Sequence, residues 1–295
     1  EEVAYVFDKA GRIAAMGSSQ ETYLASMTYD LFGRVVEVGH ANGVTDENTF
    51  YGFGENFRLQ RIRSTFGQQT YVDQSYTYPQ QGDGRISAIS DSNGGALPAL
   101  SNDVEYGYDG LGRLDGATWG STAVTDETLV YNAIGNMTNK NGPMTYSPTA
   151  RPHQVESHVS SGYAFDANGN QSGAVEPTGT RIYGFNKLDQ LTQIQFSNGT
   201  LNGTLQYAYD HSGARVQKIR PDGTKIRYFN RYAESRDGLL IKYYWAGDRL
   251  IARKQIADPR FSEAPPASPQ RETPPWLPPA LLVVFRLGGV MLYAP

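Results

Sequence analysis

The sequence predicts an all-β protein made of repeated antiparallel β-hairpins, and three observations lead to that prediction. The 295 residues include 32 glycines and 20 tyrosines. Tyrosine favours strands, and glycine favours tight turns. A short aromatic motif that continues into Asp-x-x-Gly recurs along the chain. No stretch up to residue 257 carries apolar residues at a sustained helical spacing, which argues against a helical bundle.

The composition excludes several classes of protein. The chain has no cysteine, so it has neither a disulfide framework nor a cysteine-based zinc site. Its 26 basic and 30 acidic residues give a net charge of −4, which does not favour nucleic acid as a partner. The sequence contains no Gly-x-Ser-x-Gly, phosphate-loop or His-Glu-x-x-His motif. We therefore expect a protein that is not an enzyme and has no cofactor.

The repeated motif has five clear copies, in which an aromatic residue precedes an Asp and a Gly follows that Asp by three residues. These copies are Tyr5–Ile13, Tyr29–Val35, Tyr106–Leu114, Tyr163–Asn170 and Tyr207–Val216. Weaker copies start at Tyr51, Tyr76, Val130 and Tyr183, and Met144-Thr145-Tyr146-Ser147 is predicted to be a degenerate copy. The aromatic residue before the Asp-like position falls at 7, 29, 53, 78, 108, 131, 165, 185 and 209. The repeating unit is thus about twenty residues long, with loops of variable length.

The motif has a physical interpretation as a β-hairpin. Two aromatic residues separated by one position lie on the same face of a strand, because side chains alternate with a period of two. Asp followed three residues later by Gly fits a type I turn whose Gly adopts a positive φ, and such turns join hairpin strands with a β-bulge. We therefore interpret five Asp and Gly pairs as turn residues and not as catalytic carboxylates: Asp8 and Gly11, Asp30 and Gly33, Asp109 and Gly112, Asp166 and Gly169, and Asp210 and Gly213.

The arginines and tyrosines of the motif have two interpretations each. In the first interpretation, the arginines pair with Asp or stack on tyrosine rings; in the second, they bind acidic sugars or a partner. These arginines are Arg12, Arg34, Arg113 and Arg215. The tyrosines line the sheet in the first interpretation and form a carbohydrate platform in the second. The second interpretation gives a candidate binding face of Tyr106, Tyr108, Arg113, Tyr207, Tyr209 and Arg215. His153 and His158 lie in a loop without further ligand signals, so we predict no metal site.

The repeats resemble the Rhs/YD-repeat family, which includes bacterial Rhs polymorphic toxins, the C component of insecticidal toxin complexes and the teneurins. The Tyr-Asp-x-x-Gly-Arg-Leu unit carries the resemblance. Two further segments strengthen it, the Pro-His segment Arg151–Val155 and the segment Tyr243–Arg253. The resemblance covers roughly residues 1–255. It implies a spiralling antiparallel sheet that curls into a hollow shell, which encloses a C-terminal effector in toxins and forms part of an adhesion ectodomain in teneurins.

The chain departs from the toxin pattern at the core region, where toxin-type members carry a Leu-Gly-Ser stretch and an Asp-Pro-x-Gly region. Here Asp258-Pro259 is followed by Arg260-Phe261. We therefore expect no self-cleavage and transfer no catalytic residues.

About 255 residues of sheet, at roughly 3.3 Å per residue and 4.8 Å between strands, enclose too little space for a folded toxin domain. We expect a fragment or a truncated product without N-terminal repeats, folded as an open arc of a β-shell.

The sequence divides into three parts. Residues 1–257 form the YD/RHS-repeat sheet, a partial shell. Residues 258–279 hold eight of the sixteen prolines and read as a linker. Residues 280–295 are an apolar tail, with three alternatives: a truncated membrane segment, a segment that docks on the sheet, or a tail without a role.

The function expected from these observations is that of a non-enzymatic structural scaffold, part of the shell of a large secreted or cell-surface bacterial protein of the toxin-encapsulating type. Its partners would be the remaining repeats or the C-terminal domain of the parent protein. The apolar tail would allow membrane association or anchoring. The alternative is an adhesion module that binds carbohydrate or protein through an exposed Tyr/Arg face. An autoproteolytic enzyme is a third class, which the absent Asp-Pro-x-Gly region disfavours.

Overall fold

The computed structural model describes residues 2–79, 84–92, 103–120, 126–147, 151–198 and 202–258, together with short strands at 285–287 and 290–292. These residues form antiparallel strands, and the helical structure among them is one short 3-10 helix, η1 (Phe53–Glu55). The predicted all-β fold class is confirmed. The expected linker at 258–279 lies almost entirely outside the described residues.

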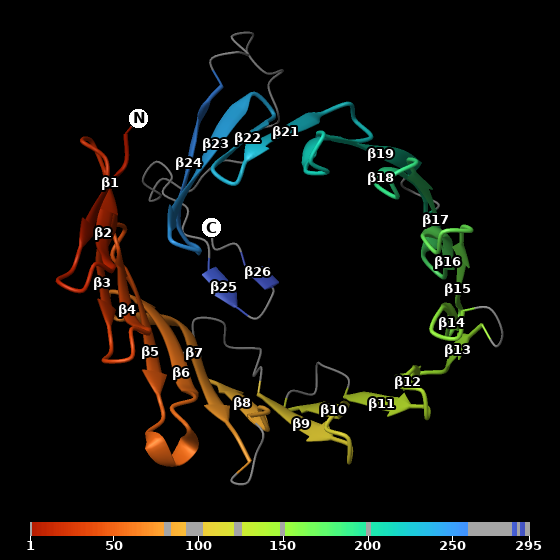
Figure 1. The fold of residues 1–295 in the computed structure, drawn as a ribbon, viewed down its shortest axis with the longest axis horizontal. Coiled ribbons are helices and arrows are strands. Elements are labelled where there is room, and N and C mark those ends of the chain that lie inside the picture. The colour runs from red at the N-terminus through yellow and green to blue at the C-terminus, as the bar shows by residue number, and fades with distance from the viewer. Residues whose placement is uncertain are drawn as a thin grey trace. The chain divides into compact units, whose positions relative to one another are not determined.

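The first sheet has twelve strands that pair in chain order, so each strand lies between its neighbours in sequence (Figure 1). Its strands are β1 (Ala4–Phe7), β2 (Ile13–Gly17), β3 (Thr22–Tyr29), β4 (Val35–His40), β5 (Val44–Phe50), β6 (Leu59–Phe66), β7 (Gln69–Thr77), β8 (Ala88–Asp91), β9 (Val104–Tyr108), β10 (Leu114–Trp119), β11 (Glu127–Tyr131) and β12 (Met137–Lys140).

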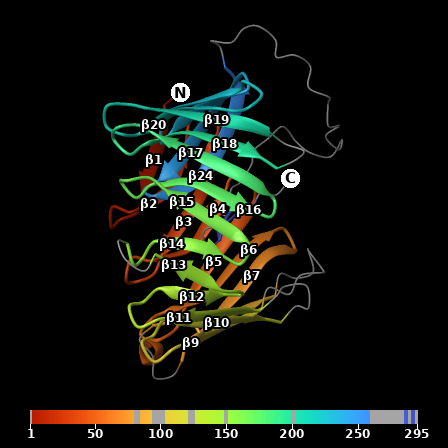
Figure 2. The same ribbon diagram turned by 90° about the vertical axis from the view of Figure 1, so that its right-hand side faces the viewer.

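The second sheet also has twelve strands in chain order, and Figure 2 shows β13 to β20 stacked side by side in that order. Its strands are β13 (Met144–Tyr146), β14 (Val155–His158), β15 (Ser161–Phe165), β16 (Gln171–Glu176), β17 (Gly179–Phe185), β18 (Leu191–Ser197), β19 (Asn202–Tyr209), β20 (Arg215–Ile219), β21 (Lys225–Asn230), β22 (Ala233–Arg236), β23 (Leu239–Ala246) and β24 (Arg249–Ala257).

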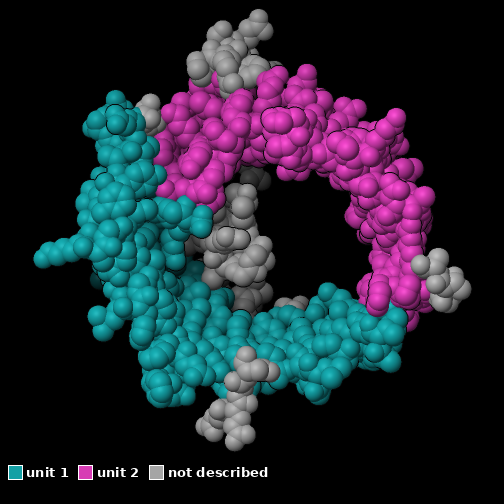
Figure 3. All heavy atoms as spheres, in the orientation of Figure 1, with its two compact units in different colours: residues 1–141, 246–251 teal, residues 142–245, 252–295 magenta. Residues whose placement is uncertain are grey.

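The chain divides into two compact units, which Figure 3 shows in different colours. Unit 1 comprises residues 1–141 and 246–251, and unit 2 comprises residues 142–245 and 252–295. In the part of the chain that the structure describes, sequence neighbours pair with one another throughout both sheets. A sheet built in this way depends on local hairpins, and each repeat contacts mainly the repeats before and after it.

One strand register recurs in the hairpins closed by the repeated turn. The aromatic residue before the turn pairs with the residue six positions later, and the register shifts at that pair in every case, as expected for a β-bulge. The pairs are Phe7 with Ile13, Tyr29 with Val35, Tyr108 with Leu114, Tyr131 with Met137, Phe165 with Gln171, Phe185 with Leu191 and Tyr209 with Arg215. The predicted hairpin with a type I turn and a bulge is confirmed in this register.

The copy that starts near Tyr51 differs from the prediction. The aromatic residue before the turn is Phe50, which pairs with Leu59, and not the residue at position 53. The Tyr51 amide donates to the Arg58 carbonyl at 2.8 Å, so the loop contains more residues than the Asp-x-x-Gly turn. The extra residues form η1. The prediction was wrong because the spacing of Tyr-Gly-Phe-Gly imitates the motif inside a longer loop.

The degenerate copy predicted at Met144-Thr145-Tyr146-Ser147 is confirmed. Tyr146 ends β13 and pairs with Val155 at a register shift, as the aromatic residues of the other copies do. The Ser147 amide donates to the Gln154 carbonyl at 3.1 Å. Gln154 therefore occupies the position that an arginine holds in the clear copies.

A group of buried side chains in unit 1 comes from one face of its first strands. Met16 pairs with Leu24, and Met27 pairs with Val38, so each pair projects from the same side of the sheet. Leu24 and Val38 have no exposed surface. This apolar group holds β2, β3 and β4 together.

The two faces of the second sheet differ in burial. Ala174 on β16 is buried and pairs with Tyr163, whereas the next residue, Val175, is 61 % exposed. Ile182 on β17 projects from the same face as Val175 and is 55 % exposed. In this part of the sheet, one face is partly filled by aromatic side chains, and the other leaves apolar side chains uncovered by the described residues.

The apolar tail contributes two short strands. β25 (Phe285–Leu287) and β26 (Val290–Leu292) pair antiparallel to each other. The rest of the tail lies outside the described residues. Among the residues that the structure places, no helix has the length and apolar character needed to cross a membrane.

The turn register makes a prediction at Gly33. This glycine has a φ of +79°, and a Cβ placed there would meet no atom within 4 Å, so the conformation alone opposes substitution. We expect Gly33→Ala to lower the free energy of unfolding by about 1–2 kcal/mol, measured by urea denaturation followed by circular dichroism. Gly110 lies in the equivalent turn after Asp109 without a positive φ and with the same open space. Gly110→Ala is the control, and an equal loss in both variants would contradict the prediction.

Candidate functional site: the turn clusters

The repeated turn is held by one carboxylate. Asp8 Oδ1 accepts hydrogen bonds from the backbone amides of Ala10 (2.8 Å) and Arg12 (2.9 Å). Asp8 Oδ2 accepts from Arg12 Nε at 2.7 Å and lies 2.7 Å from Arg12 Nη2. The Asp8 amide in turn donates to the Arg12 carbonyl at 2.8 Å. The side chain of Asp8 therefore closes the turn through Oδ1 and fixes the guanidinium group through Oδ2, which both nitrogens contact.

Two other copies repeat this geometry. Asp30 Oδ1 accepts from the Phe32 and Arg34 amides at 2.9 Å, and its Oδ2 accepts from Arg34 Nε at 2.7 Å. Asp109 makes the same contacts with Leu111 and Arg113, at 2.9 and 2.7 Å. We call each such carboxylate, its two amides and its arginine a turn cluster.

The turn hydrogen bonds stabilise the charged form of these carboxylates. The Arg12 backbone amide, followed by the Arg12 side chain, holds the pKa of Asp8 below its ordinary value. Arg113 lowers the pKa of Asp109 in the same order. For Asp30, burial opposes the charge, but the hydrogen bonds from Arg34 outweigh burial and the pKa is lowered.

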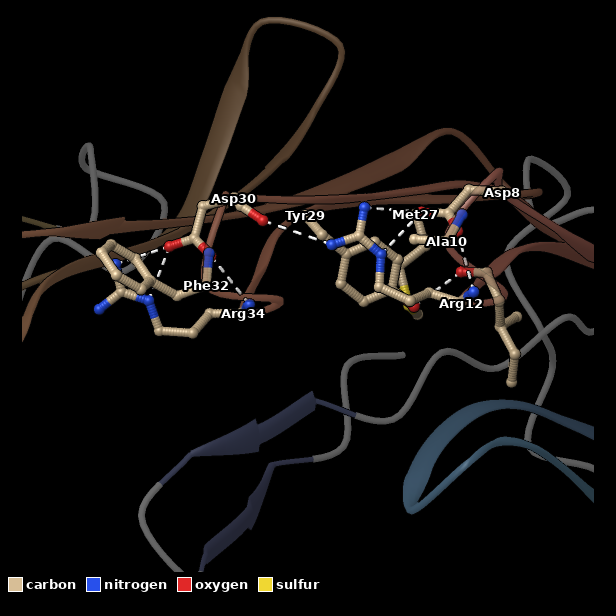
Figure 4. A network of polar contacts seen from close by, with 9 residues as sticks. Asp8, Ala10, Arg12, Met27, Tyr29, Asp30, Phe32 and Arg34 are labelled. Atoms are coloured by element: carbon tan, nitrogen blue, oxygen red, sulfur yellow. Dashed lines mark hydrogen bonds and ion pairs between the residues drawn. The ribbon is translucent and has the colours of Figure 1, made fainter.

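Each arginine also reaches the aromatic residue of the following copy. The Arg12 guanidinium carbon lies 4.4 Å from the centroid of the Tyr29 ring, and Arg12 Nη1 donates to the Asp30 carbonyl at 3.3 Å. The Tyr29 hydroxyl donates back to the Ile13 carbonyl at 2.7 Å. Burial raises the pKa of this hydroxyl. Figure 4 shows the two successive clusters linked in this way.

The same link recurs along unit 1. Further guanidinium groups lie over the aromatic ring of the next copy, namely Arg34 over Phe50 (3.8 Å), Arg58 over Tyr78 (5.1 Å), Arg85 over Tyr108 (4.8 Å) and Arg113 over Tyr131 (4.4 Å). Tyrosine hydroxyls donate to the residue after the arginine position, as Tyr108 does to Ile86 and Tyr131 to Leu114, and in unit 2 Tyr209 donates in the same way to Leu191. The arginines and tyrosines thus bind neighbouring repeats to each other.

From the copy at Asn132 onward, other side chains take the arginine position. Asn170 donates through Nδ2 to Asp166 Oδ2 at 3.0 Å. In the next copy both partners are amides, and Asn186 Nδ2 donates to Gln190 Oε1 at 2.8 Å. Asn136 follows Asn132 in the same position, and its amide donates to Asn132 Oδ1. The hydrogen-bond pattern of the turn is kept while the charged arginine is lost, and Asp166 and Asp210 keep the carboxylate.

The sequence profile of the teneurin YD-shell family matches residues 53–241, which is more than half of the chain. The chain belongs to the teneurin YD-shell family. The predicted resemblance to the Rhs/YD-repeat proteins is therefore confirmed. A structural role in a shell follows from this membership.

Solved structures with the same fold include three that contain TccC3. A crystal structure of TcdB2-TccC3-Cdc42 is 19 % identical, with a TM-score of 0.66, and covers 87 % of this chain and 15 % of that one. A crystal structure of TcdB2-TccC3 is 18 % identical with a TM-score of 0.60, and a Photorhabdus luminescens Tc holotoxin pore is 18 % identical with a TM-score of 0.57. Each of these two covers 86 % of this chain, which matches 14 % of their length. These identities show the fold alone. No curated protein matches the chain.

Within this YD-shell chain, one arginine lies elsewhere than the sequence predicts. Arg215 pairs with Tyr209 across the hairpin, one position later than Arg12, Arg34 and Arg113 in their turns. Ala214 occupies the arginine position, since its carbonyl accepts from the Asp210 amide at 2.9 Å. The alignment of Arg215 with the other three was wrong because this copy keeps the usual spacing but has Ala214 at the arginine position, so that Arg215 is the first residue of the return strand, as Ile13 is in the first copy.

The tyrosines of the candidate binding face are partly buried. Burial raises the pKa values of Tyr106 and Tyr207, which project from the same face as Tyr108 and Tyr209. Arg215 lies over the Tyr207 ring at 5.5 Å. The role of these residues in binding stays a prediction.

Asp189 takes a role that the sequence interpretation missed. It has a φ of +56° in the turn position that Gly holds in other copies. Its Oδ1 accepts hydrogen bonds from Asn168 Nδ2 and Asn170 Nδ2, both at 2.8 Å. Asp189 therefore connects its own turn to the preceding one. The spacing Asn186-x-x-Asp189 was the available signal, because Asn and Asp tolerate positive φ better than most residues.

A second missed feature is a buried polar group in unit 1. Ser64 Oγ donates to Asp46 Oδ1 at 2.6 Å, and His40 Nε2 lies 2.9 Å from Asp46 Oδ2. The three residue types match a hydrolase triad, but the serine binds the carboxylate and not the histidine, so the geometry does not activate a nucleophile. Among the residues placed by the structure, no three metal-ligating side chains gather at one point.

The link between Arg12 and Tyr29 predicts a measurable coupling. Arg12→Ala and Tyr29→Leu should each lower the free energy of unfolding, and a double-mutant cycle should give a coupling of about 0.5–1 kcal/mol in favour of the pair. The measurement is urea denaturation of the four proteins. Lys9 and Tyr29 form the control pair, because no hydrogen bond or ring contact joins them. Their double-mutant cycle should give a coupling free energy near zero. A zero coupling for Arg12 and Tyr29 would contradict the link.

The lowered pKa values predict a loss of stability in acid. A turn aspartate whose pKa is lower in the folded chain than its unfolded value of about 3.9 stabilises the fold above that value. This stabilisation is lost as the pH falls through the folded pKa, because the unfolded chain binds more protons. We expect the free energy of unfolding to fall steeply below about pH 4. Urea denaturation between neutral and acid pH measures it.

The control for this pH dependence is Asp109→Asn, which keeps an Oδ1 acceptor as Asn132 and Asn186 do in their own turns. The variant removes one titrating carboxylate and should show a shallower slope with pH. An identical slope in variant and wild type would mean that Asp109 does not contribute.

Proposed function

We propose that the chain is a non-enzymatic wall segment of a YD-repeat shell, of the toxin-encapsulating type, in a large secreted or cell-surface protein. The observation that supports this most directly is the series of turn clusters. Its carboxylates, guanidinium groups and tyrosine hydroxyls bind neighbouring repeats, as Asp8, Arg12 and Tyr29 do. Groups that hold adjacent strands together are expected in a wall.

The uneven faces of the second sheet support a wall that separates two environments. Val175 and Ile182 expose apolar surface on one face, and Ala174 is buried on the other. Apolar side chains grouped on an exposed face commonly mark a surface that contacts another polypeptide. We infer that such a polypeptide belongs to the parent protein.

The lengths of the structural relatives support further chain as the partner. The chain matches 14–15 % of the chains in the TccC3 assemblies. A shell of that size would need additional repeats beside this segment. The remaining repeats and the C-terminal domain of the parent protein are therefore the proposed partners.

The adhesion module has less support. A sugar platform needs free ring faces and free hydroxyls, but the Tyr108 hydroxyl donates to the Ile86 carbonyl and Arg85 lies over the Tyr108 ring at 4.8 Å. The Tyr209 hydroxyl likewise donates to the Leu191 carbonyl.

Cysteine labelling tests the wall. The chain contains no cysteine, and Arg181 and Ile182 are adjacent, exposed residues of β17 on opposite faces. Each is replaced singly by cysteine, in this chain and in a cysteine-free full-length parent protein, and treated with a polymer-linked maleimide. We expect both sites to react in the isolated chain and one to be protected in the parent. Equal reaction of both sites in the parent would refute encapsulation.

A further inference from the structure

One turn cluster lacks the donor that the others contain. Where a turn aspartate is followed four residues later by a side-chain donor, that donor binds the carboxylate Oδ2. The pairs are Asp8 with Arg12, Asp30 with Arg34, Asp109 with Arg113 and Asp166 with Asn170. At Asp210 the corresponding residue is Ala214, whose methyl group donates no hydrogen bond.

The exposed carboxylate of Asp210 uses only one of its two oxygens in the turn. Its Oδ1 accepts from the Ser212 amide (2.8 Å), the Ser212 hydroxyl (2.7 Å) and the Ala214 amide (3.0 Å). Its Oδ2 accepts no hydrogen bond from the residues that the structure describes. The turn is thus closed as in the other copies, while the oxygen that binds a guanidinium group elsewhere is left available.

A cavity lies at this place in unit 2. It has a volume of about 410 Å³, and its lining includes Tyr209, Asp210, Ala214, Tyr228 and Phe229. In the equivalent space of the Asp109 cluster, the Arg113 side chain extends from the carboxylate to the ring of the next copy. The cavity therefore lies beside the carboxylate at the place where Ala214 supplies no arginine side chain, while Arg215 covers the Tyr228 ring.

We propose that this cavity binds a guanidinium group supplied by another molecule or segment. Asp210 Oδ2 would accept its N–H groups, as Asp109 Oδ2 accepts from Arg113 at 2.7 Å. The Tyr209 and Phe229 side chains supply aromatic surface beside the carboxylate. A carboxylate next to aromatic rings is a chemical environment that suits a planar organic cation.

Two cations of the chain limit the affinity and set the selectivity. Arg215 lies over the Tyr228 ring at 4.9 Å, and Arg231 lies over the Trp245 ring at 4.8 Å, and both side chains line the cavity. Their charge opposes any incoming cation. A compact ammonium gains only one strong contact against this repulsion, whereas a guanidinium group can bind Oδ2 through two N–H groups and stack on a ring. We expect a dissociation constant on the order of 10 mM.

A titration of the full chain followed by NMR tests the site. The probes are methylguanidinium, the peptide acetyl-Gly-Arg-Leu-amide, and the matched acetyl-Gly-Lys-Leu-amide. We expect saturable shifts of the Asp210, Ser212 and Ala214 amide resonances with both guanidinium probes and none with the lysine peptide. Tighter binding of the arginine peptide would identify a polypeptide as the source of the group, and equal binding would identify a small molecule. Equal shifts with the lysine peptide would overturn the proposal.

Three variants locate the binding. Ala214→Arg supplies the side chain from within and should abolish the shifts, and Asp210→Asn should weaken binding at least tenfold. Arg113→Ala reproduces the arrangement beside Asp109 and should create a second site, seen at the Leu111 amide. Binding that persists unchanged in Ala214→Arg would overturn the proposal. Circular dichroism of each variant confirms that the sheet is retained.

Discussion

The hydrogen bonds accepted by the turn carboxylate are the interaction on which the rest of the structure depends. Asp8 Oδ1 fixes two backbone amides and so determines where the return strand begins. That start fixes the pairing of Phe7 with Ile13, and a slip of one residue would move every side chain of the strand to the other face. In a sheet whose strands pair with their sequence neighbours, the turn therefore provides much of the control over strand register.

The second function of the turn is to orient the arginine side chain. Because Asp8 Oδ2 holds Arg12 at two nitrogens, the guanidinium plane is set before it meets the next copy. It then covers the Tyr29 ring, whose hydroxyl binds the Ile13 carbonyl beside the same arginine. The later copies keep the turn with amides, as in Asn186 and Gln190. The hydrogen-bond geometry is thus needed for the hairpin, and the guanidinium group adds the contact between repeats.

The sequence was sufficient for features that depend on residues close together in the chain. Asp30 and Gly33 define a turn within four residues, so the hairpins and their bulges could be predicted. The stacking of Arg12 on Tyr29 joins positions seventeen apart across a loop of variable length, and no local pattern encodes that distance. The group of His40, Asp46 and Ser64 comes from three strands and had no signal at all.

The errors at Phe50 and Arg215 each concern a single copy of the repeat. After Phe50, extra residues lengthen the loop, so that motif spacing no longer reports strand register. After Tyr209, the spacing is unchanged, but Ala214 occupies the arginine position and Arg215 begins the return strand. Because each repeat binds mainly its neighbours, such a change alters one interface and leaves the distant strands unaffected. The chain can therefore replace Arg by Ala214 and open a cavity beside Asp210 without losing the sheet. A repeat architecture tolerates local chemical specialisation for this reason, whereas a single shared core would transmit the defect to every strand.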